Sequence, residues 1–394
     1  MSADEESLLP HPSFRMVEPD FDSHLTQLII DLDYLRRKKE WGGTTPTYLF
    51  EQIRSTFFML ESFSSARIEG NRTTIAEYIQ EKVSPAASKP HSIREIANLE
   101  NALRFIEETA RDNPINSLYI RELHKQVVAG LPVQEEGDHT PGEFRRGEVR
   151  IVNSGHRPPV YGDVPILIDQ MVAELEKPRQ PRYDLLKMAL SHHRFVWIHP
   201  FTNGNGRSAR LFTYALLVKY GFALEAGRIA NPASVFCATR DEYYRRLQVA
   251  DTATESDPHD PQGLLDWCEY VLAGLKEEIG KVEKLTDYAF LSKKVLIPAI
   301  KNSRLYDDIT PDEEQVLMLT TKTPEIKVAD VNQLLGKSNS TCTRIIESLR
   351  KKGMLAGETE TSRKYRLQIT NNALLKGIIQ AFVDNQLLPT SIVK

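Results

Sequence analysis

The sequence predicts a mainly α-helical protein with more than one domain. Apolar residues recur at three- and four-residue spacing through most of the chain, which is the period of a helix with one buried face. The alternation of polar and apolar residues that marks a half-buried strand is scarce. The chain has 394 residues, more than one hydrophobic core usually organises, so two or three domains are expected.

The composition is that of a soluble globular protein, with 41% hydrophobic and 26% charged residues. Lys and Arg total 50 against 54 Asp and Glu, which excludes a wholly basic protein that coats nucleic acid but leaves room for a local basic patch. Cys237, Cys268 and Cys342 lie far apart, so we expect small core residues in a reducing compartment, without a disulfide framework or a structural zinc.

The start of the chain is acidic and has none of the features of a signal peptide. Apolar runs are too short to span a bilayer. We therefore expect a cytoplasmic protein without a membrane partner.

Taken in order, the first half of the chain predicts four helices and one hairpin. The helices are expected at 25–35, Pro46–Ser65, His91–Thr109 and Ser117–Ala129. Between Thr140 and Asp163 the composition changes to Gly, Pro and β-branched residues. Glu148–Asn153 alternates polar and apolar residues, which predicts a short hairpin that turns near Asn153–Gly155.

Helical spacing then returns. It predicts helices at Val164–Glu176, Arg182–His199, Arg207–Tyr220 and Asp260–Leu285. Pro200 ends the second of these helices, because a proline cannot continue the hydrogen-bond ladder. A glycine-containing loop separates it from the third.

That loop, His199-Pro-Phe-Thr-Asn-Gly-Asn-Gly-Arg-Ser-Ala-Arg210, has the features of an anion site. Gly204 and Gly206 allow positive φ and close backbone approach, and backbone amides beside a helix N-terminus bind anions. Arg207 and Arg210 suit a polyphosphate, and two arginines at a helix start call for a compensating anion. A histidine such as His199 can accept a proton near neutral pH. Each feature alone is common. Their combination within twelve residues indicates a reactive site that binds an anion.

The segment closely resembles the Fic signature HPFx[D/E]GNGRxxR. Two further segments extend the resemblance to about Ser62–Asp251: Ser191-His-His-Arg-Phe-Val-Trp-Ile-His199, with His192, and Pro141-Gly-Glu-Phe-Arg145. The resemblance implies a Fic helical core with a short β-hairpin flap. It also implies transfer of AMP from ATP to a Ser, Thr or Tyr hydroxyl of a target protein and of the chain itself, with release of pyrophosphate.

By the same resemblance, His199 is the general base, Phe201 anchors the loop, and Gly204, Asn205 and Gly206 hold the α- and β-phosphates. Arg207 steadies the leaving phosphates and Arg210 holds the γ-phosphate. A flap at about 151–156, including Val152 and His156, lays the target over the site by strand addition. Tyr243 and Tyr244 line the adenine pocket, although ordinary helix-face aromatic residues are nearly as good an interpretation.

Asn203 departs from the signature, which has Asp or Glu at that place to bind Mg²⁺. An amide oxygen is a neutral ligand for a hard cation, so weaker metal binding is expected. The same change is what a degenerate, merely nucleotide-binding Fic domain would show.

Ser65-Ala-Arg-Ile-Glu-Gly70 resembles the inhibitory [S/T]xxxE[G/N] motif of Fic proteins, in the class whose inhibitory helix precedes the catalytic loop. Ser65 and Glu69 are four residues apart, hence on one helix face, and Gly70 is a helix C-cap. The resemblance implies that Glu69 pairs with Arg210 and displaces the γ-phosphate. Alternatively, Glu69 positions a water molecule for removal of AMP.

From Thr310 the pattern is helix, helix, turn, helix and hairpin, which resembles a winged helix-turn-helix. Residues 327–367 hold nine Lys and Arg against four Asp and Glu. Ser338, Asn339, Thr341, Thr343 and Arg344 would then face a major groove. Many winged helices contact only proteins, so DNA and a homodimer partner both stay open.

We therefore expect an N-terminal helical region over 1–110 with the inhibitory helix at about 50–70, a Fic catalytic domain over 111–290 and a winged-helix domain over 300–375. The preferred function is an autoinhibited adenylyltransferase that uses ATP and Mg²⁺. The alternatives are a DNA-binding regulator with a nucleotide-sensing, catalytically weak Fic domain, and an enzyme with another diphosphate-bearing donor.

Overall fold

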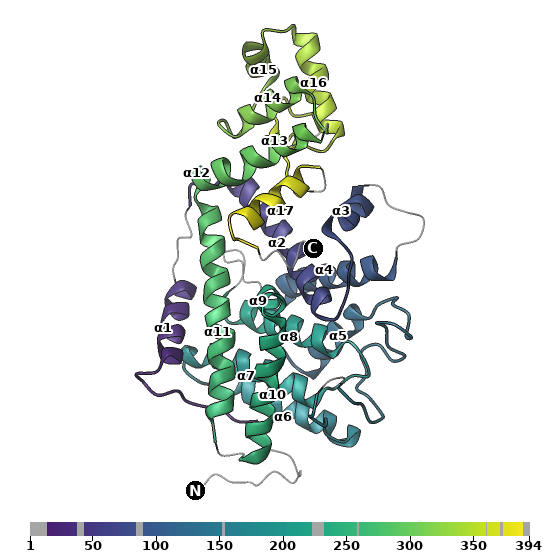
Figure 1. The fold of residues 1–394 in the computed structure, drawn as a ribbon, viewed down its shortest axis with the longest axis vertical. Coiled ribbons are helices and arrows are strands. Elements are labelled where there is room, and N and C mark those ends of the chain that lie inside the picture. The colour runs from purple at the N-terminus through teal and green to yellow at the C-terminus, as the bar shows by residue number, and fades with distance from the viewer. Residues whose placement is uncertain are drawn as a thin grey trace. The chain divides into compact units, whose positions relative to one another are not determined.

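The structure is a computed structural model that describes residues 14–37, 43–83, 90–151, 154–222, 232–257, 260–306, 308–359, 361–370 and 373–388. These residues are mainly helical and contain one two-stranded sheet (Figure 1), as the sequence predicts. They divide into two compact units, the first from Met1–Lys39, Glu61–Arg72 and Pro90–Ile279, and the second from Glu40–Leu60, Thr73–Lys89 and Gly280–Lys394. The division into three consecutive domains stays a prediction.

The first unit is built around two helices joined by the glycine-containing loop, α7 (Asp184–Ile198) and α8 (Asn205–Lys219), which pack against each other. Nearly every side chain of both helices is buried. Around them lie α1 (His24–Arg37), α4 (His91–Thr109), α5 (Ser117–Val127), η1 (Tyr161–Asp163), α6 (Val164–Glu176), η2 (Pro181–Tyr183), α9 (Pro232–Ala238), α10 (Arg240–Ser256) and α11 (Gln262–Glu283). α8 also contacts α4, α5 and α9, and α7 contacts α6, so neighbouring helices surround the two helices that carry the loop (Figure 1).

The long helix α2 (Thr47–Ile68) contributes its first turns to the second unit and its last turns to the first. Its last turns run three residues beyond the predicted end at Ser65. Gly70 follows with φ of 103°, a conformation that glycine adopts without strain. Glu69 thus lies at the end of α2, just before the chain turns.

The second unit places α13 (Ile297–Leu305) against α17 (Leu374–Asp384). Its other elements are α3 (Ile75–Val83), η4 (Lys284–Thr286), α12 (Tyr288–Leu291), the π-helical η5 (Ser292–Leu296), α14 (Pro311–Thr320), α15 (Val328–Leu335), α16 (Asn339–Lys351), β1 (Leu355–Ala356) and β2 (Arg366–Leu367). The strands are antiparallel, with Leu355 opposite Leu367.

Local signals account for the order of elements in this unit. Thr310 and Glu313 form a capping box at the start of α14, and Ser338 caps α16 by accepting from the amide of Thr341. Gly336 ends α15 with φ of 63°. Three helices followed by a strand pair are the order predicted from the sequence. The identity of this region as a winged helix-turn-helix stays a prediction.

The predicted hairpin at Glu148–Asn153 is wrong in its described part. Residues 148–151 and 154–160 form no strand, while Asn153 and Val152 lie outside the described residues. The chain there is held by the side chain of Arg145, which donates to the carbonyl oxygens of Gly147 and Pro159. Two consecutive prolines, at 158 and 159, also remove two backbone donors that a ladder needs.

Sequence reasoning missed several helices, among them α3, α9, α10, α13 and α17. In α17 the signal was weakened by Gly377, because glycine lowers helix propensity. The structure explains that glycine: a Cβ there would lie 2.8 Å from the Cα of Ala299 in α13. Close packing of two helices thus overrides local propensity.

All three cysteines are buried and unbridged, as expected. Along the described residues, no helix combines the length and apolarity that crossing a membrane would require.

Candidate active site

A cavity of about 860 Å³ in the first unit gathers most of the predicted site residues. A cavity of this size suits a small-molecule ligand. Its lining includes His199, Asn203, Gly204, Asn205, Gly206, Arg207, Arg210, Glu69, His156, Tyr243 and Tyr244. Val152 lies outside the described residues, and Ser65 reaches the site through its contact with Arg210.

The loop between α7 and α8 is closed by its own side chains. The side chain of Asn205 accepts from the amide of Phe201 and donates to its carbonyl oxygen, both at 2.8 Å. Gly204 has φ of 69° and caps α8. This cap starts α8 at Asn205, two residues before the predicted start at Arg207. Phe201 is buried, as expected of a loop anchor.

Gly206 serves a different purpose from Gly204, because its φ is not positive. A Cβ at Gly206 would lie 2.2 Å from Oε1 of Glu69. Glycine here leaves room for the carboxylate of Glu69 in its pair with Arg210.

His199 sits at the end of α7 in the left-handed conformation, with φ of 50°. Its Nδ1 lies 3.3 Å from the carbonyl oxygen of Val196. Since a carbonyl only accepts, Nδ1 carries the proton and Nε2 keeps its lone pair. Burial lowers the pKa of His199 to about 4, so the ring is neutral at pH 7. A neutral imidazole with an available Nε2 can act as a general base.

Arg145, in the Pro141–Arg145 segment that extended the family resemblance, fixes the backbone around His199. Its Nε donates to the carbonyl oxygen of His199 at 2.8 Å, and its own amide donates to the carbonyl oxygen of Pro200. His156 lines the cavity, and its Nε2 donates to the carbonyl oxygen of Trp197 at 2.8 Å. Arg145 and His156 therefore hold residues 145–151 and 154–160 to the end of α7.

Arg210 is held by residues at the end of α2. Its Nη2 lies 2.6 Å from Oε1 of Glu69 and 3.0 Å from the carbonyl oxygen of Ser65, and its Nε donates to Oγ of Ser65 at 2.9 Å. Burial alone would raise the pKa of Glu69, but the charges of Arg210 and Arg207 and the hydrogen bond from Arg210 together outweigh it and hold that pKa below the usual range. The two charges therefore persist together at pH 7.

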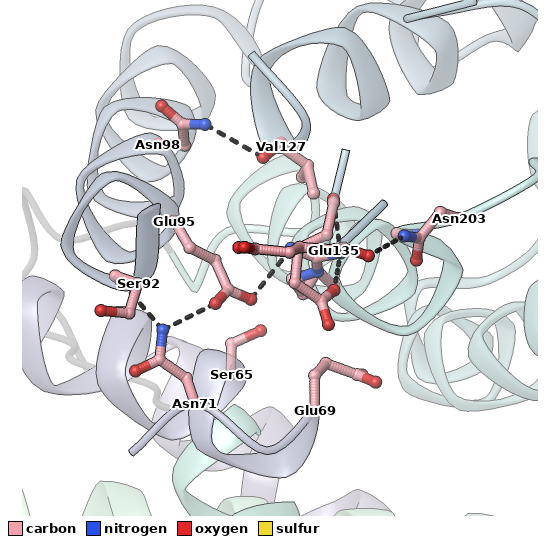
Figure 2. A network of polar contacts seen from close by, with 12 residues as sticks. Ser65, Glu69, Asn71, Ser92, Glu95, Asn98, Val127, Glu135 and Asn203 are labelled. Atoms are coloured by element: carbon pink, nitrogen blue, oxygen red, sulfur yellow. Dashed lines mark hydrogen bonds and ion pairs between the residues drawn. The ribbon is translucent and has the colours of Figure 1, made fainter. Parts of the chain in front are cut away.

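Arg207 points to a different set of carboxylates from Arg210. Its guanidinium contacts Glu95 on α4 at 2.9 Å and Glu136, in the loop after α5, at 2.5 Å. Sequence reasoning expected an anion near these arginines but did not identify either glutamate. Figure 2 shows Glu95 also facing Asn71, which follows the end of α2.

Both the nitrogen and the oxygen of the side-chain amide of Asn203, the residue that departs from the family signature, form hydrogen bonds. Its Nδ2 donates to the carbonyl oxygens of Glu135 and Gly137 at 3.1 and 3.3 Å, and its Oδ1 accepts from the amide of Gly204 at 2.7 Å (Figure 2). Among the described residues, no three His, Cys, Asp or Glu side chains could hold a metal together. This donor set does not fit a protein-held Mg²⁺.

His124 and Asp138 position the loop and were not found from the sequence. His124 on α5 stacks on Phe201 with ring centroids 3.7 Å apart. Its Nδ1 accepts from the amide of Gly142, so its Nε2 donates to the carbonyl oxygen of Asn203 at 3.1 Å. Asp138 accepts from the amide of Asn203. A lone histidine in an amphipathic helix carries no spacing signal, which is why it escaped notice.

We expect His124 to make the stability of the chain depend on pH. Burial lowers its pKa to about 4, whereas an unfolded histidine titrates near 6.5. Between these values only the unfolded chain binds the proton, so stability is lost as pH falls. We expect His124 to contribute a loss of about 2 kcal/mol in the free energy of unfolding between pH 7 and pH 5.

Urea unfolding followed by circular dichroism at pH 7 and pH 5 checks this expectation. His124→Asn removes the titrating group, so its free energy of unfolding should depend less steeply on pH than that of the parent. Equal pH dependence in both chains would contradict the assignment.

At the other end of the cavity, Tyr243 and Tyr244 lie side by side on α10, with ring centroids 5.1 Å apart. Tyr243 is buried, and its hydroxyl lies 2.9 Å from Nε2 of His192, whose Nδ1 lies 2.7 Å from Oγ1 of Thr213. Tyr244 is 42% exposed and lies against the guanidinium of Arg240. The exposed ring of Tyr244 could stack on a planar ring, whereas Tyr243 packs on Phe236 with ring centroids 4.7 Å apart.

Comparison with known proteins finds relatives of the segment that contains this loop. Residues 114–217 match the Fic/DOC family. The protein adenylyltransferase Fic of Aedes aegypti is 30% identical over 195 residues, which cover 48% of this chain and 36% of that protein. The protein of the same description from Drosophila melanogaster is 28% identical over 194 residues, with the same shares. The chain thus spans about a third of the length of these curated relatives.

A solved structure of a Fic family protein from Desulfovibrio desulfuricans has a TM-score of 0.54 and 18% identity, and covers 91% of this chain and 98% of that one. A Fic domain-containing signaling protein from Bacteroides thetaiotaomicron has a TM-score of 0.50 and 18% identity, and covers 67% of this chain and 98% of that one. At these identities the likeness concerns the fold.

Proposed function

We propose that the chain is an autoinhibited protein adenylyltransferase, because its residues 114–217 match the Fic/DOC family. It transfers AMP from ATP to a Ser, Thr or Tyr hydroxyl of a target protein and of itself. One observation supports the proposal most. His199 is neutral with a lone pair on Nε2, and it lines the same cavity as the loop Gly204–Arg210, which is proposed to bind the phosphates.

In the proposed reaction, Nε2 of His199 accepts the proton of the attacking hydroxyl. The hydroxyl oxygen forms a bond to the α-phosphorus, and the bond from that phosphorus to the bridging oxygen breaks, so that pyrophosphate leaves with the electron pair. The backbone at Gly204–Gly206, at the start of α8, faces the α- and β-phosphates. Arg207 steadies the leaving pyrophosphate and Arg210 holds the γ-phosphate. Adenine lies against Tyr243 and Tyr244.

No step of this reaction uses a metal held by the protein. Asn203 is committed to the loop, so Mg²⁺ enters the proposal only as the cation that accompanies the phosphates of ATP. The target segment is proposed to lie along the 148–160 segment by strand addition, since backbone groups there form no strand ladder in the described residues.

Autoinhibition rests on the pair of Glu69 and Arg210. With its guanidinium occupied by Glu69 and Ser65, Arg210 cannot hold the γ-phosphate, and ATP binds in an unreactive pose. The alternative role of Glu69, in which it orients water for removal of AMP, remains a second proposal for the same carboxylate.

The experiment that tests the function compares two labels on ATP. The Glu69→Gly chain is incubated with a protein mixture and ATP labelled either at the α- or at the γ-phosphate. Adenylyl transfer places only the α-label on protein. Incorporation of the γ-label instead would mean phosphoryl transfer and would overturn the proposal.

The second candidate is a DNA-binding regulator with a nucleotide-sensing Fic domain. Its support is α16, where Asn339, Thr343 and Arg344 are exposed after the Ser338 cap, in a region with a surplus of basic residues. Absence of both labels on protein, with ATP binding intact, would favour this candidate.

A further inference from the structure

The starting observation is that Arg207, like Arg210, is not open to a ligand. Its side chain is 1% exposed and its guanidinium contacts two carboxylates, those of Glu95 and Glu136. Together with Glu69, this places three carboxylates beside the two arginines assigned to the phosphates. A polyphosphate that enters the site must therefore compete for both guanidiniums.

The two partners of Arg207 differ in how firmly they are held. Glu95 is 4% exposed, and both of its oxygens are used: Oε1 by Arg207, and Oε2 by Nδ2 of Asn71 at 2.6 Å. Asn71 is itself fixed by a bond to the carbonyl oxygen of Ser92 at 2.8 Å (Figure 2). Glu95 is therefore a permanent partner that sets the orientation of Arg207.

Glu136 is placed differently, because its side chain is 40% exposed. The loop on either side of it is tied down, since Nδ2 of Asn203 donates to the carbonyl oxygens of Glu135 and Gly137. The carbonyl oxygen of Glu136 also accepts from Nη2 of Arg207 at 3.1 Å. A rotation of the Glu136 side chain alone can thus uncover one edge of the guanidinium while the backbone stays in place.

We propose that Glu136 is a second inhibitory carboxylate, which occupies on Arg207 the place of the β-phosphate as Glu69 occupies on Arg210 that of the γ-phosphate. This inference rests on the proposed function, because it takes the phosphates of a nucleotide as the competing ligand. The geometry identifies Glu136 as the more weakly held partner, because its side chain is 40% exposed whereas that of Glu95 is buried and also bound by Asn71. An incoming phosphate therefore displaces Glu136. Glu136 contacts Arg207 and Glu69 contacts Arg210, so the two ion pairs block different guanidiniums.

Nucleotide binding measured by calorimetry on the full chain tests this inference. We expect Glu136→Gln to bind ADP about fivefold more tightly than the parent, as the loss of a partly exposed ion pair suggests. Adenosine has no phosphate to compete, so its affinity should not change. Glu135→Gln is the matched control. It removes one negative charge from the exposed side chain of the neighbouring residue and leaves the ion pair of Glu136 with Arg207 intact.

The proposal that Glu136 is a second inhibitory carboxylate is supported if Glu136→Gln binds ADP more tightly than the parent, while Glu135→Gln does not and the affinity for adenosine is unchanged. In the Glu69→Gly background the gain should persist, because the two carboxylates hold different arginines. Equal ADP affinities of the two glutamine variants, or an equal gain for adenosine, would overturn the inference and leave the proposed function standing. Failure of every variant to bind ADP and adenosine would overturn the proposed function and this inference with it.

Discussion

Glu69→Gly is expected to raise AMP incorporation about 10- to 100-fold over the parent chain. Loss of one partner from a buried ion pair costs about 3–5 kcal/mol, and about 1.4 kcal/mol is a factor of ten. This cost alone corresponds to about 100- to 4000-fold. The Glu69 side chain is 27% exposed, and Ser65 still holds Arg210 after the change. Both facts bring the expected effect below that range.

The measurement is incorporation of α-labelled AMP into the chain itself and into added protein. Glu69→Gln serves as the matched variant, because it keeps the size of the side chain and can still accept a bond from Arg210 without the charge. An intermediate gain is expected for it. Equal incorporation by parent and Glu69→Gly would show that the pair does not inhibit.

The comparison of Glu69→Gly with Glu69→Gln also separates charge from backbone effects. Glycine at this position lies beside Gly70 and adds backbone freedom at the end of α2. If only the glycine variant were active, loosening of α2 would explain the release better than loss of the ion pair.

Features that depend on neighbouring residues could be predicted from the sequence, whereas contacts between distant residues mostly could not. The catalytic loop is contiguous, so its helix–loop–helix form and its glycines could be read from twelve residues. Glu69 was found only because a second motif marks it, since nothing in the spacing places it beside Arg210, 141 residues away. The mainly helical fold follows from the apolar periodicity, which needs no long-range information.

The residues that complete the site could not be predicted, because they come from separate elements with no shared pattern. Glu95 on α4, Glu136 after α5 and His124 on α5 each look like ordinary surface or core positions in sequence. A physical hint did exist: two arginines at a helix N-terminus need anions nearby. It predicts that carboxylates are present but not which of the 54 acidic residues supply them.

For the 148–160 segment, the local sequence pattern led to a wrong prediction of a hairpin. Polar–apolar alternation favours a strand, but a strand needs a partner to pair with. Here Arg145 takes the carbonyl oxygens of Gly147 and Pro159, and the described residues form no ladder. If the target supplies the missing strand, the alternation has a function that the chain alone does not display.

His199→Ala, made in the Glu69→Gly background, is expected to lower AMP transfer about 10²- to 10⁴-fold, the usual contribution of a general base. Nucleotide affinity should stay within about twofold, because the imidazole takes a proton and holds no phosphate. His24→Ala is the matched control, since it removes an exposed imidazole on α1 and should leave transfer unchanged. A comparable loss of ADP binding in His199→Ala would mean that the histidine maintains the structure of the loop rather than accepting a proton.

The pH profile of the Glu69→Gly chain supplies an independent check on the base. A base must be neutral to accept a proton, and burial lowers the pKa of His199 to about 4. Transfer should therefore stay nearly level from pH 8 to pH 6 and decline only as the pH approaches 4. A decline centred near 6.5, the value of an ordinary histidine, would mean that the ring is solvated when ATP is bound, and that burial by the inhibitory segment is what depresses its pKa in the closed state.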